Sequence, residues 1–255
     1  MRFSVVDFLN ARPLTRGLLE EPPPGVEVSR DAPSVCAAKV ATGEADVGLI
    51  PSIEYQRIPD LKVVAGLGIA AASEVRSVLL VSNVSREKIR SVGLDPASRT
   101  SAVLTRLLLK RRYGIEPAYG PPGAGTDAVL VIGDPALKTR LNGHVVLDLA
   151  AEWRAFSGHS FVFAFWAMRP GVPEGEATRI VHASYEAGRR DFPALVAGEA
   201  VRSGLSEAVV EDYLRHSLHY ELDARDLAGL DLFYRLAAED GLIERPRPVD
   251  FARTS

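Results

Sequence analysis

Short apolar, β-branched runs alternate with helical patterns through the first 170 residues of this 255-residue chain, and this alternation constrains the fold more than any other feature. Strands that alternate with helices are typical of βαβ units, whose strands form a largely parallel sheet. From about residue 174 onward the pattern changes to helices alone, which we expect over 177–190, 206–217 and 226–240. The sequence therefore predicts an α/β fold with packing helices in its C-terminal part.

Two extended apolar segments, 75–81 and 161–168, bracket a middle block that has strand and helix signals of its own. If both segments cross between two lobes, the middle block is a lobe inserted into another, and the two strands act as a hinge. We therefore expect a discontinuous first lobe, residues 1–76 and 169–255, and a second lobe, residues 77–168. A cleft between two such lobes is a preferred place for a small-molecule site.

Composition and charge argue against several classes of function. With 30 basic and 33 acidic residues the formal charge is −3, the wrong sign for a protein that follows a phosphate backbone, so we expect no nucleic-acid partner. The apolar runs fall short of the roughly 20 residues that cross a bilayer, and the first residues show no secretory pattern. We therefore expect a cytoplasmic protein with no membrane partner. The single cysteine, Cys36, lacks a partner for a disulfide or a thiolate metal site, so we expect a buried apolar filler.

One local pattern occurs four times: an apolar strand, a short polar step and then a helix start. In parallel α/β sheets these turns gather outside the carboxyl ends of the strands, where ligands bind. A helix N-terminus also presents unpaired amides that suit a carboxylate or a phosphate. The third junction is the strongest candidate, because Thr100 and Ser101 add hydroxyl donors to the amides. The polar steps are residues 7–10, 51–52, 95–101 and 133–134.

Ordinary structural roles compete with ligand binding at these junctions. Ser52, Ser98 and Asp134 fit helix N-caps, which stabilise a helix by about 1 kcal/mol each. An Asp134 carboxylate would also repel an anionic ligand, so we favour a cap or an orienting group at that position. Asn10 fits equally a cap or a partner for a substrate hydroxyl. For Arg12 we expect a solvated side chain rather than a ligand contact.

Catalytic signatures are mostly missing from the sequence. The chain has no nucleophile-elbow, zinc-protease, Walker or dinucleotide-binding motif. None of the five histidines has a suitable partner at metal-ligand spacing, and His216 and His219 fit surface or capping roles at a helix end. The residues themselves therefore predict a small-anion site with neither a metal nor a cofactor.

Six motifs stand in order along the chain: FLNARPL at 8–14, GLIPSIEY at 48–55, SRTS at 98–101, VIGD at 131–134, EW at 152–153 and FVFAFW at 161–166. Their order and spacing together resemble the chorismate dehydratases of the futalosine route to menaquinone, and the resemblance runs nearly end to end. One departure is Ser160, because the family often has a proline directly before the following phenylalanine.

The resemblance implies a fold and a reaction. The fold is the two-lobed, periplasmic-binding-protein-like fold of type II, used as an enzyme, which agrees with the lobes inferred from the residues. The enzyme is a carbon–oxygen lyase (hydro-lyase) without a cofactor, which removes water from chorismate and leaves 3-[(1-carboxyvinyl)oxy]benzoate. The sequence does not identify the proton acceptor, for which a carboxylate of the substrate itself is one candidate.

The resemblance also implies the site residues. On the family pattern Asn10 and Ser77 are catalytic and lie beside the reacting hydroxyl and the enolpyruvyl group, while Thr100 and Ser101 bind a carboxylate. From local sequence alone, a polar residue on an alternating strand explains Ser77 better than a functional role does. The remaining substrate-binding residues are Ser52, Ser98, Gly133 and Asp134.

Two other functions compete with this hypothesis. The sister enzyme of the same pathway, 1,4-dihydroxy-6-naphthoate synthase, shares the fold but needs a larger cleft and a dedicated base. A non-catalytic protein that binds small anions is also compatible, because a fold does not determine a function.

Overall fold

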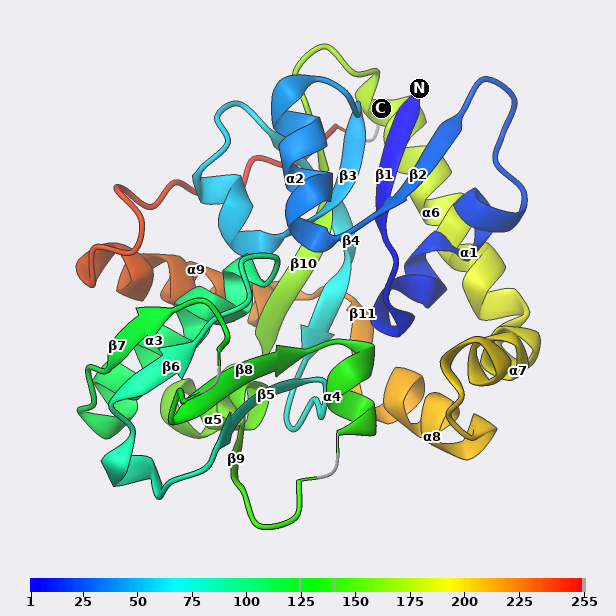
Figure 1. The fold of residues 1–255 in the computed structure, drawn as a ribbon. Coiled ribbons are helices and arrows are strands. Elements are labelled where there is room, and N and C mark those ends of the chain that lie inside the picture. The colour runs from blue at the N-terminus through cyan, green and yellow to red at the C-terminus, as the bar shows by residue number, and fades with distance from the viewer. Residues whose placement is uncertain (124, 140, 254–255) are drawn as a thin grey trace.

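The chain forms two β-sheets with helices packed around them, in a computed structural model that describes residues 1–123, 125–139 and 141–253 (Figure 1). The first sheet has the strand order β11-β4-β10-β3-β1-β2, and the second has the order β7-β6-β8-β5-β9. The strands are β1 (Arg2–Val6), β2 (Glu27–Asp31), β3 (Val47–Pro51), β4 (Lys62–Ala71), β5 (Val78–Ser82), β6 (Ser91–Gly93), β7 (Ala118–Gly120), β8 (Ala128–Ile132), β9 (Val145–Asp148), β10 (Phe161–Met168) and β11 (His219–Glu221). The helices are α1 (Arg12–Glu20), α2 (Pro33–Thr42), α3 (Arg99–Tyr113), α4 (Asp134–Lys138), α5 (Leu149–Ser157), α6 (Glu174–Arg190), α7 (Phe192–Ser203), α8 (Glu207–Asp212) and α9 (Ala224–Glu239).

Both sheets are mixed, which corrects the expectation of a largely parallel sheet. Strand β1 is parallel to β2 and β3, but β10 is antiparallel to β3 and β4. In the second sheet β6 is parallel to β7 and β8, whereas β5 is antiparallel to β8 and β9. Strand β10 returns from the second sheet and enters the first in the direction opposite to its neighbours. The α/β class is confirmed, and β5 and β10, each the first strand after the chain changes sheet, are both antiparallel to their neighbours.

The C-terminal part is mostly helical, as expected, but contains two elements that the pattern did not predict. Helices α6, α8 and α9 lie where helices were expected, and a π-helical turn, Tyr213–Ser217, extends α8. Helix α7 and the short strand β11 are new. Strand β11 forms because it pairs with the free edge of β4, a long-range partner that local sequence does not reveal.

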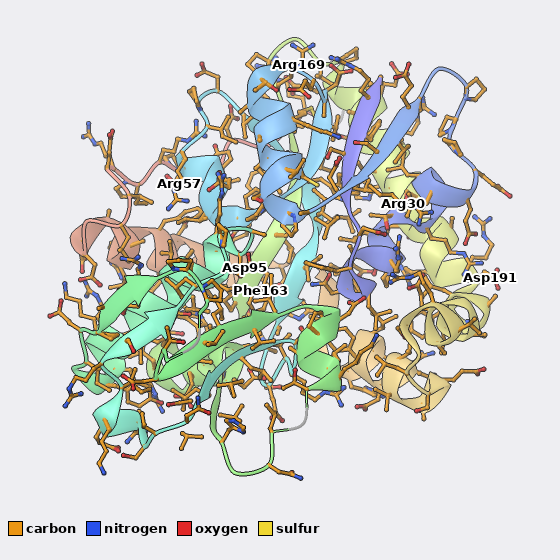
Figure 2. The ribbon with its side chains drawn as sticks, viewed as in Figure 1. Arg30, Arg57, Asp95, Phe163, Arg169 and Asp191 are labelled. Atoms are coloured by element: carbon orange, nitrogen blue, oxygen red, sulfur yellow. The ribbon has the colours of Figure 1, made fainter. Side chains whose placement is uncertain are left out.

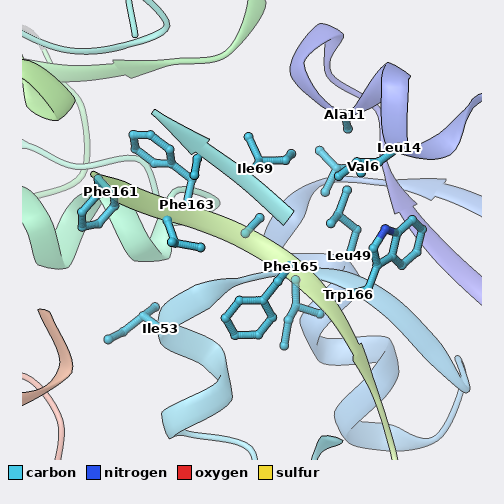
Figure 3. Close-up of a cluster of buried hydrophobic side chains, with 14 of the residues drawn as sticks. Val6, Ala11, Leu14, Leu49, Ile53, Ile69, Phe161, Phe163, Phe165 and Trp166 are labelled. Atoms are coloured by element: carbon cyan, nitrogen blue, oxygen red, sulfur yellow. The ribbon is translucent and has the colours of Figure 1, made fainter. Parts of the chain in front are cut away.

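Strand β10 is the centre of the hydrophobic core. All eight of its residues are buried, because β3 and β4 flank it and helices cover its sheet. Burial on both faces explains its unbroken apolar sequence. Phe161, Phe163, Phe165 and Trp166 lie along this strand (Figure 3). Phe161 packs edge-on against Trp153 with ring centroids 5.5 Å apart, and Phe165 packs against Tyr55 at 6.0 Å. Cys36 is fully buried, as expected of an apolar filler.

Helices α1 and α6 cover the first sheet and pack closely against each other (Figure 1). A Cβ atom added at Gly188 on α6 would lie 2.2 Å from the carbonyl oxygen of Pro13 on α1. Glycine at this position therefore permits the approach of the two helices. Throughout the described residues, we find no helix with the length and apolar character needed to cross a membrane.

The chain passes between the two sheets twice. Residues 72–77 connect β4 to β5, and α5 with residues 158–160 connects β9 to β10. The expected division placed 161–168 with the second lobe, but these residues pair with the first sheet. The lobe boundaries at 76 and 168 stay a prediction. The strand pairing shows in addition that β10 belongs to the first sheet.

Candidate active site

A cleft lies between the two sheets, with about 590 Å³ of empty space, part of it open to solvent. The wall combines the end of β1, the 72–77 connection, the start of α3, the end of β8 and the middle of β10. Phe163 of β10 lies at this meeting point near the centre of the molecule (Figure 2). Most of the lining is apolar: Val6, Phe8, Ile69, Val75, Val78, Ile132, Phe163 and Leu218.

Most of the residues singled out from the sequence meet in this cleft, although they come from distant parts of the chain. The polar steps of all four junctions reach the wall, the second through Pro51. The predicted site residues that line it are Asn10, Ser77, Ser98, Thr100, Ser101 and Gly133. The roles assigned to these residues stay predictions, and their common position allows one small molecule to contact several of them.

Two polar atoms on the wall are enclosed by protein and have no hydrogen-bond partner among the described residues. They are Asn10 Oδ1, on a 3₁₀ turn (Leu9–Ala11), and Ser98 Oγ, directly before α3. Ser98 occupies the N-cap position of α3, but its side chain makes no capping bond, so the expectation of an ordinary cap is wrong. Leaving a buried polar group unpaired costs about 1–3 kcal/mol, and a ligand that hydrogen-bonds these atoms recovers that cost.

Ser77 is held in place by both its backbone and its side chain. Its carbonyl oxygen accepts a hydrogen bond from the Gly133 amide (2.8 Å), and its Oγ accepts one from the Tyr213 hydroxyl (2.7 Å). The residue is buried and lies directly before β5, so it is not part of an alternating strand. The preceding Arg76 has a positive φ of 63°, and the Asp148 carboxylate accepts its amide hydrogen at 2.6 Å. Burial raises the pKa of Asp148, although the amide hydrogen bonds oppose this rise.

Ser52 and Thr100 join the second and third junctions. Thr100 Oγ1 accepts the Ile53 amide hydrogen at 3.2 Å and lies 3.5 Å from Ser52 Oγ. Ser52 Oγ donates to the Val162 carbonyl oxygen at 2.8 Å, so it supports the wall from behind and does not cap a helix. The cap expected at Ser52 is therefore wrong, because a carbonyl group of β10 takes its hydroxyl.

Asp134 connects the fourth junction to the first. Its Oδ1 accepts the Leu9 amide hydrogen at 2.9 Å, and its Oδ2 lies 3.6 Å from an Arg202 nitrogen. It makes no capping bond to its own helix, so it is an orienting group rather than a cap. Next to it, Gly133 has a φ of 66°, and a Cβ atom there would lie 3.3 Å from the Phe8 ring. Residues 133–134 are thus in direct contact with residues 8–9.

Arg12 is buried, which corrects the expectation of a solvated side chain. It forms ion pairs with Asp7 and with Glu199, the latter at 3.2 Å. Glu199 lies on α7, the helix that the sequence pattern did not predict. Helix α7 shields Arg12 from solvent. Its Glu199 carboxylate offsets the free-energy cost of burying the Arg12 charge.

The electrostatics of the cleft favour an anion. Among the described residues that line it, Arg99 carries a positive charge and no carboxylate is present. Arg99 pairs with the buried Glu54 at 2.6 Å, and Glu54 also binds Arg57 at 2.8 Å, so one carboxylate is shared by two cations. The first-turn amides of the fifteen-residue helix α3 have no intrahelical acceptors and add partial positive charge.

The described residues contain no cluster of metal-ligating side chains. His219 lies in β11 rather than at a helix end, and its Nε2 is 2.9 Å from Asp226 Oδ1. Asp226 also accepts from Ser160 and belongs to the capping box of α9, so this group has a structural role.

Two residues of the site were not predicted from the sequence. Phe163 was considered only as part of an apolar strand, and Tyr213 only as part of a C-terminal helix. Nothing in the local pattern distinguishes either one, because their positions depend on how β10 and the π-helical turn pack.

A family model described as menaquinone biosynthesis matches residues 1–239 of the chain. The chain belongs to this family. A chorismate dehydratase of Thermus thermophilus is 30% identical over 253 residues, which cover 89% of this chain and 91% of the relative. A chorismate dehydratase of Campylobacter jejuni is 31% identical over 170 residues, covering 64% and 66%. The family that the motifs indicated is therefore confirmed, and its members include enzymes.

Solved structures confirm the fold class. A protein of Archaeoglobus fulgidus superimposes with a TM-score of 0.74 at 17% identity, covering 95% of this chain and 98% of that one. The periplasmic aliphatic sulphonate binding protein of Escherichia coli gives a TM-score of 0.63 at 18% identity, covering 100% and 94%. The family member described here thus has the periplasmic-binding-protein-like fold expected from the sequence.

Proposed function

We propose that this protein is a chorismate dehydratase, a hydro-lyase that converts chorismate to 3-[(1-carboxyvinyl)oxy]benzoate and water. The observation that carries the proposal is the cleft between the sheets, which offers unpaired polar atoms at Asn10 and Ser98, the positive end of α3, and no carboxylate among its described lining residues. Chorismate is a small dicarboxylate with one ring, and it matches the charge preference of this cleft. The dehydratase relatives support the same substrate.

The proposed reaction balances without a co-reactant. The C–H bond on the ether-bearing ring carbon breaks, and its electron pair forms the new ring double bond. The C–O bond to the neighbouring hydroxyl breaks, and hydroxide leaves with the released proton as water. The ring becomes aromatic, so the elimination is favourable and the enzyme needs only to lower its barrier. A carboxylate of the substrate takes the proton first, because intramolecular groups held close to a reacting bond act at high effective concentration.

Within this proposal Asn10 and Ser77 orient the leaving hydroxyl and the enolpyruvyl group. Both line the cleft, and both can donate a hydrogen bond to the oxygen that gains charge as the C–O bond breaks. On the opposite part of the wall, Thr100 and Ser101 with the first-turn amides of α3 bind a substrate carboxylate.

The remaining predicted residues take supporting roles in the proposal. Gly133 and Ser98 complete the wall around the substrate. Ser52 and Asp134 hold the wall through Val162 and Leu9 rather than through contact with the substrate.

The test is to mix the purified protein with chorismate and to follow the enolpyruvyl benzoate by chromatography with mass detection. Product formed at a rate proportional to enzyme concentration supports the dehydratase. Intact chorismate with well-folded protein refutes it. Turnover of the sister enzyme's substrate would then assign 1,4-dihydroxy-6-naphthoate synthase, and binding of chorismate without turnover would assign a non-catalytic binding protein.

A further inference from the structure

Ser77 is hydrogen-bonded to a side chain from the C-terminal helical region. Tyr213 is the first residue of the π-helical turn Tyr213–Ser217, and its hydroxyl donates to Ser77 Oγ at 2.7 Å. Both side chains are buried, with about 1% of each residue exposed. Single π-helical turns within helices occur frequently at functional sites, because they move one side chain out of the regular helical position.

The direction of this hydrogen bond determines where the Ser77 hydrogen points. Tyr213 is the donor in this hydrogen bond, and burial raises the pKa of Tyr213, so the phenol keeps the proton that it donates. A serine hydroxyl has one hydrogen and two acceptor positions. Because Tyr213 occupies an acceptor position, the hydrogen of Ser77 points away from Tyr213 and is available to a group in the cleft.

The same turn also holds the backbone before Ser77. Arg76 Nε donates to Ser217 Oγ at 3.0 Å, and an Arg76 nitrogen lies 2.7 Å from Asp212 Oδ2. The left-handed backbone of Arg76 is strained for a non-glycine residue and persists only where its surroundings hold it. Side-chain contacts from residues 212–217 thus fix both the position and the hydrogen-bonding direction of Ser77.

We propose that Tyr213 is a positioning residue that acts through Ser77, by directing the Ser77 hydroxyl hydrogen toward the hydroxyl that leaves chorismate. The inference rests on the proposed dehydratase function and extends it to a residue outside the cleft wall. Tyr213 does not touch the substrate, so its effect passes entirely through the orientation of one hydroxyl group.

The chain provides a matched control in Tyr220. This tyrosine lies on β11, is buried like Tyr213, and its hydroxyl has no hydrogen-bond partner among the described residues. It does not line the cleft. Tyr220→Phe therefore removes an equally buried oxygen without changing Ser77, and it controls for the loss of a core hydroxyl.

The experiment measures kcat and KM for chorismate in the wild type, Tyr213→Phe, Tyr220→Phe, Ser77→Ala and the Ser77→Ala/Tyr213→Phe double variant. We expect Tyr213→Phe to lower kcat about five- to tenfold, the effect of losing one hydrogen bond, with KM changed less than about twofold. Tyr220→Phe should match the wild type. In the Ser77→Ala background, Tyr213→Phe should change kcat by less than about twofold, because Tyr213 acts through the missing hydroxyl. Melting temperatures confirm that every variant is folded.

Three results would overturn the inference while leaving the dehydratase in place: wild-type kcat in Tyr213→Phe, an equal loss in Tyr220→Phe, or an undiminished loss in the Ser77→Ala background. If the wild type forms no product from chorismate, the proposed function fails and the inference fails with it. The wild-type measurement thus separates the two failures.

Discussion

The contact between Asp134 and Leu9 can be tested by removing one carboxylate. In Asp134→Ala the buried Leu9 amide loses its acceptor, which costs about 1–3 kcal/mol. The 3.6 Å contact with the partly exposed Arg202 adds at most about 1 kcal/mol. Leu9 follows a strand of the first sheet and Asp134 follows a strand of the second. Losing this hydrogen bond therefore destabilises the arrangement in which the two sheets are in contact across the cleft. A ligand that contacts both sheets binds only to that arrangement. The affinity of Asp134→Ala for chorismate should therefore fall about 5- to 150-fold.

Asp134→Asn is the matched control, because its side chain keeps an oxygen that can accept the Leu9 amide hydrogen. We expect its affinity for chorismate, measured by titration calorimetry, to stay within about fivefold of the wild type. Hydrogen exchange of the Leu9 amide gives a readout that does not depend on the ligand, and it should accelerate in Asp134→Ala but not in Asp134→Asn. Equal affinity and equal exchange in Asp134→Ala and the wild type would refute the reasoning. So would an Asn variant as damaged as the Ala variant.

Three further predictions follow from the site and from the first sheet. Gly133→Ala should lower the free energy of unfolding by about 1–3 kcal/mol, measured by urea denaturation, because the positive φ strains a non-glycine residue and a Cβ atom would lie 3.3 Å from the Phe8 ring. Asn10→Ala and Ser77→Ala should each lower kcat about 10- to 100-fold, the cost of one hydrogen bond to a group that gains charge, and native rates in both would contradict their proposed roles. The hydrogen bond from Arg2 holds the pKa of Asp46 well below its usual value, so Asp46 stabilises the fold fully above about pH 4 and loses this effect as pH falls further. Asp46→Asn should therefore melt at a lower temperature at pH 7 and show a shallower fall between about pH 5 and pH 2, whereas an unchanged slope would contradict the assignment.

The parts of the fold that could be predicted from the sequence depend on local pattern. The alternation of strands and helices, the buried run that became β10 and the start of α3 all follow from periodicity and residue type. The antiparallel direction of β10 could not be predicted in this way, because it depends on which sheet receives the returning chain. Strand β11 was missed for the same reason, since its three residues form a strand only beside the edge of β4.

The site was predictable to the extent that strand ends gather at one edge. Asn10 and Thr100 reached the cleft as the junction argument indicated. The caps expected at Ser52 and Ser98 were wrong: the Val162 carbonyl oxygen takes the Ser52 hydroxyl, and the Ser98 side chain makes no capping bond. Of the two roles considered for Asp134, the orienting one holds, because its partner Leu9 is distant in sequence. Tyr213 had no local signal, because its contact with Ser77 spans 136 positions of the chain.

The position of β10 at the centre of the first sheet has a consequence for the order of folding. Its neighbours β3 and β4 are synthesised before any strand of the second sheet, whereas β10 follows all of them. The second sheet uses a continuous stretch of chain and can close on nearby contacts, which favours early formation during synthesis. In a nascent chain that stops before residue 161, β3 and β4 therefore have unpaired apolar edges, because the strand that lies between them is not yet made. Such edges attract other strands, so chaperone binding should be strongest in the interval before β10 emerges from the ribosome.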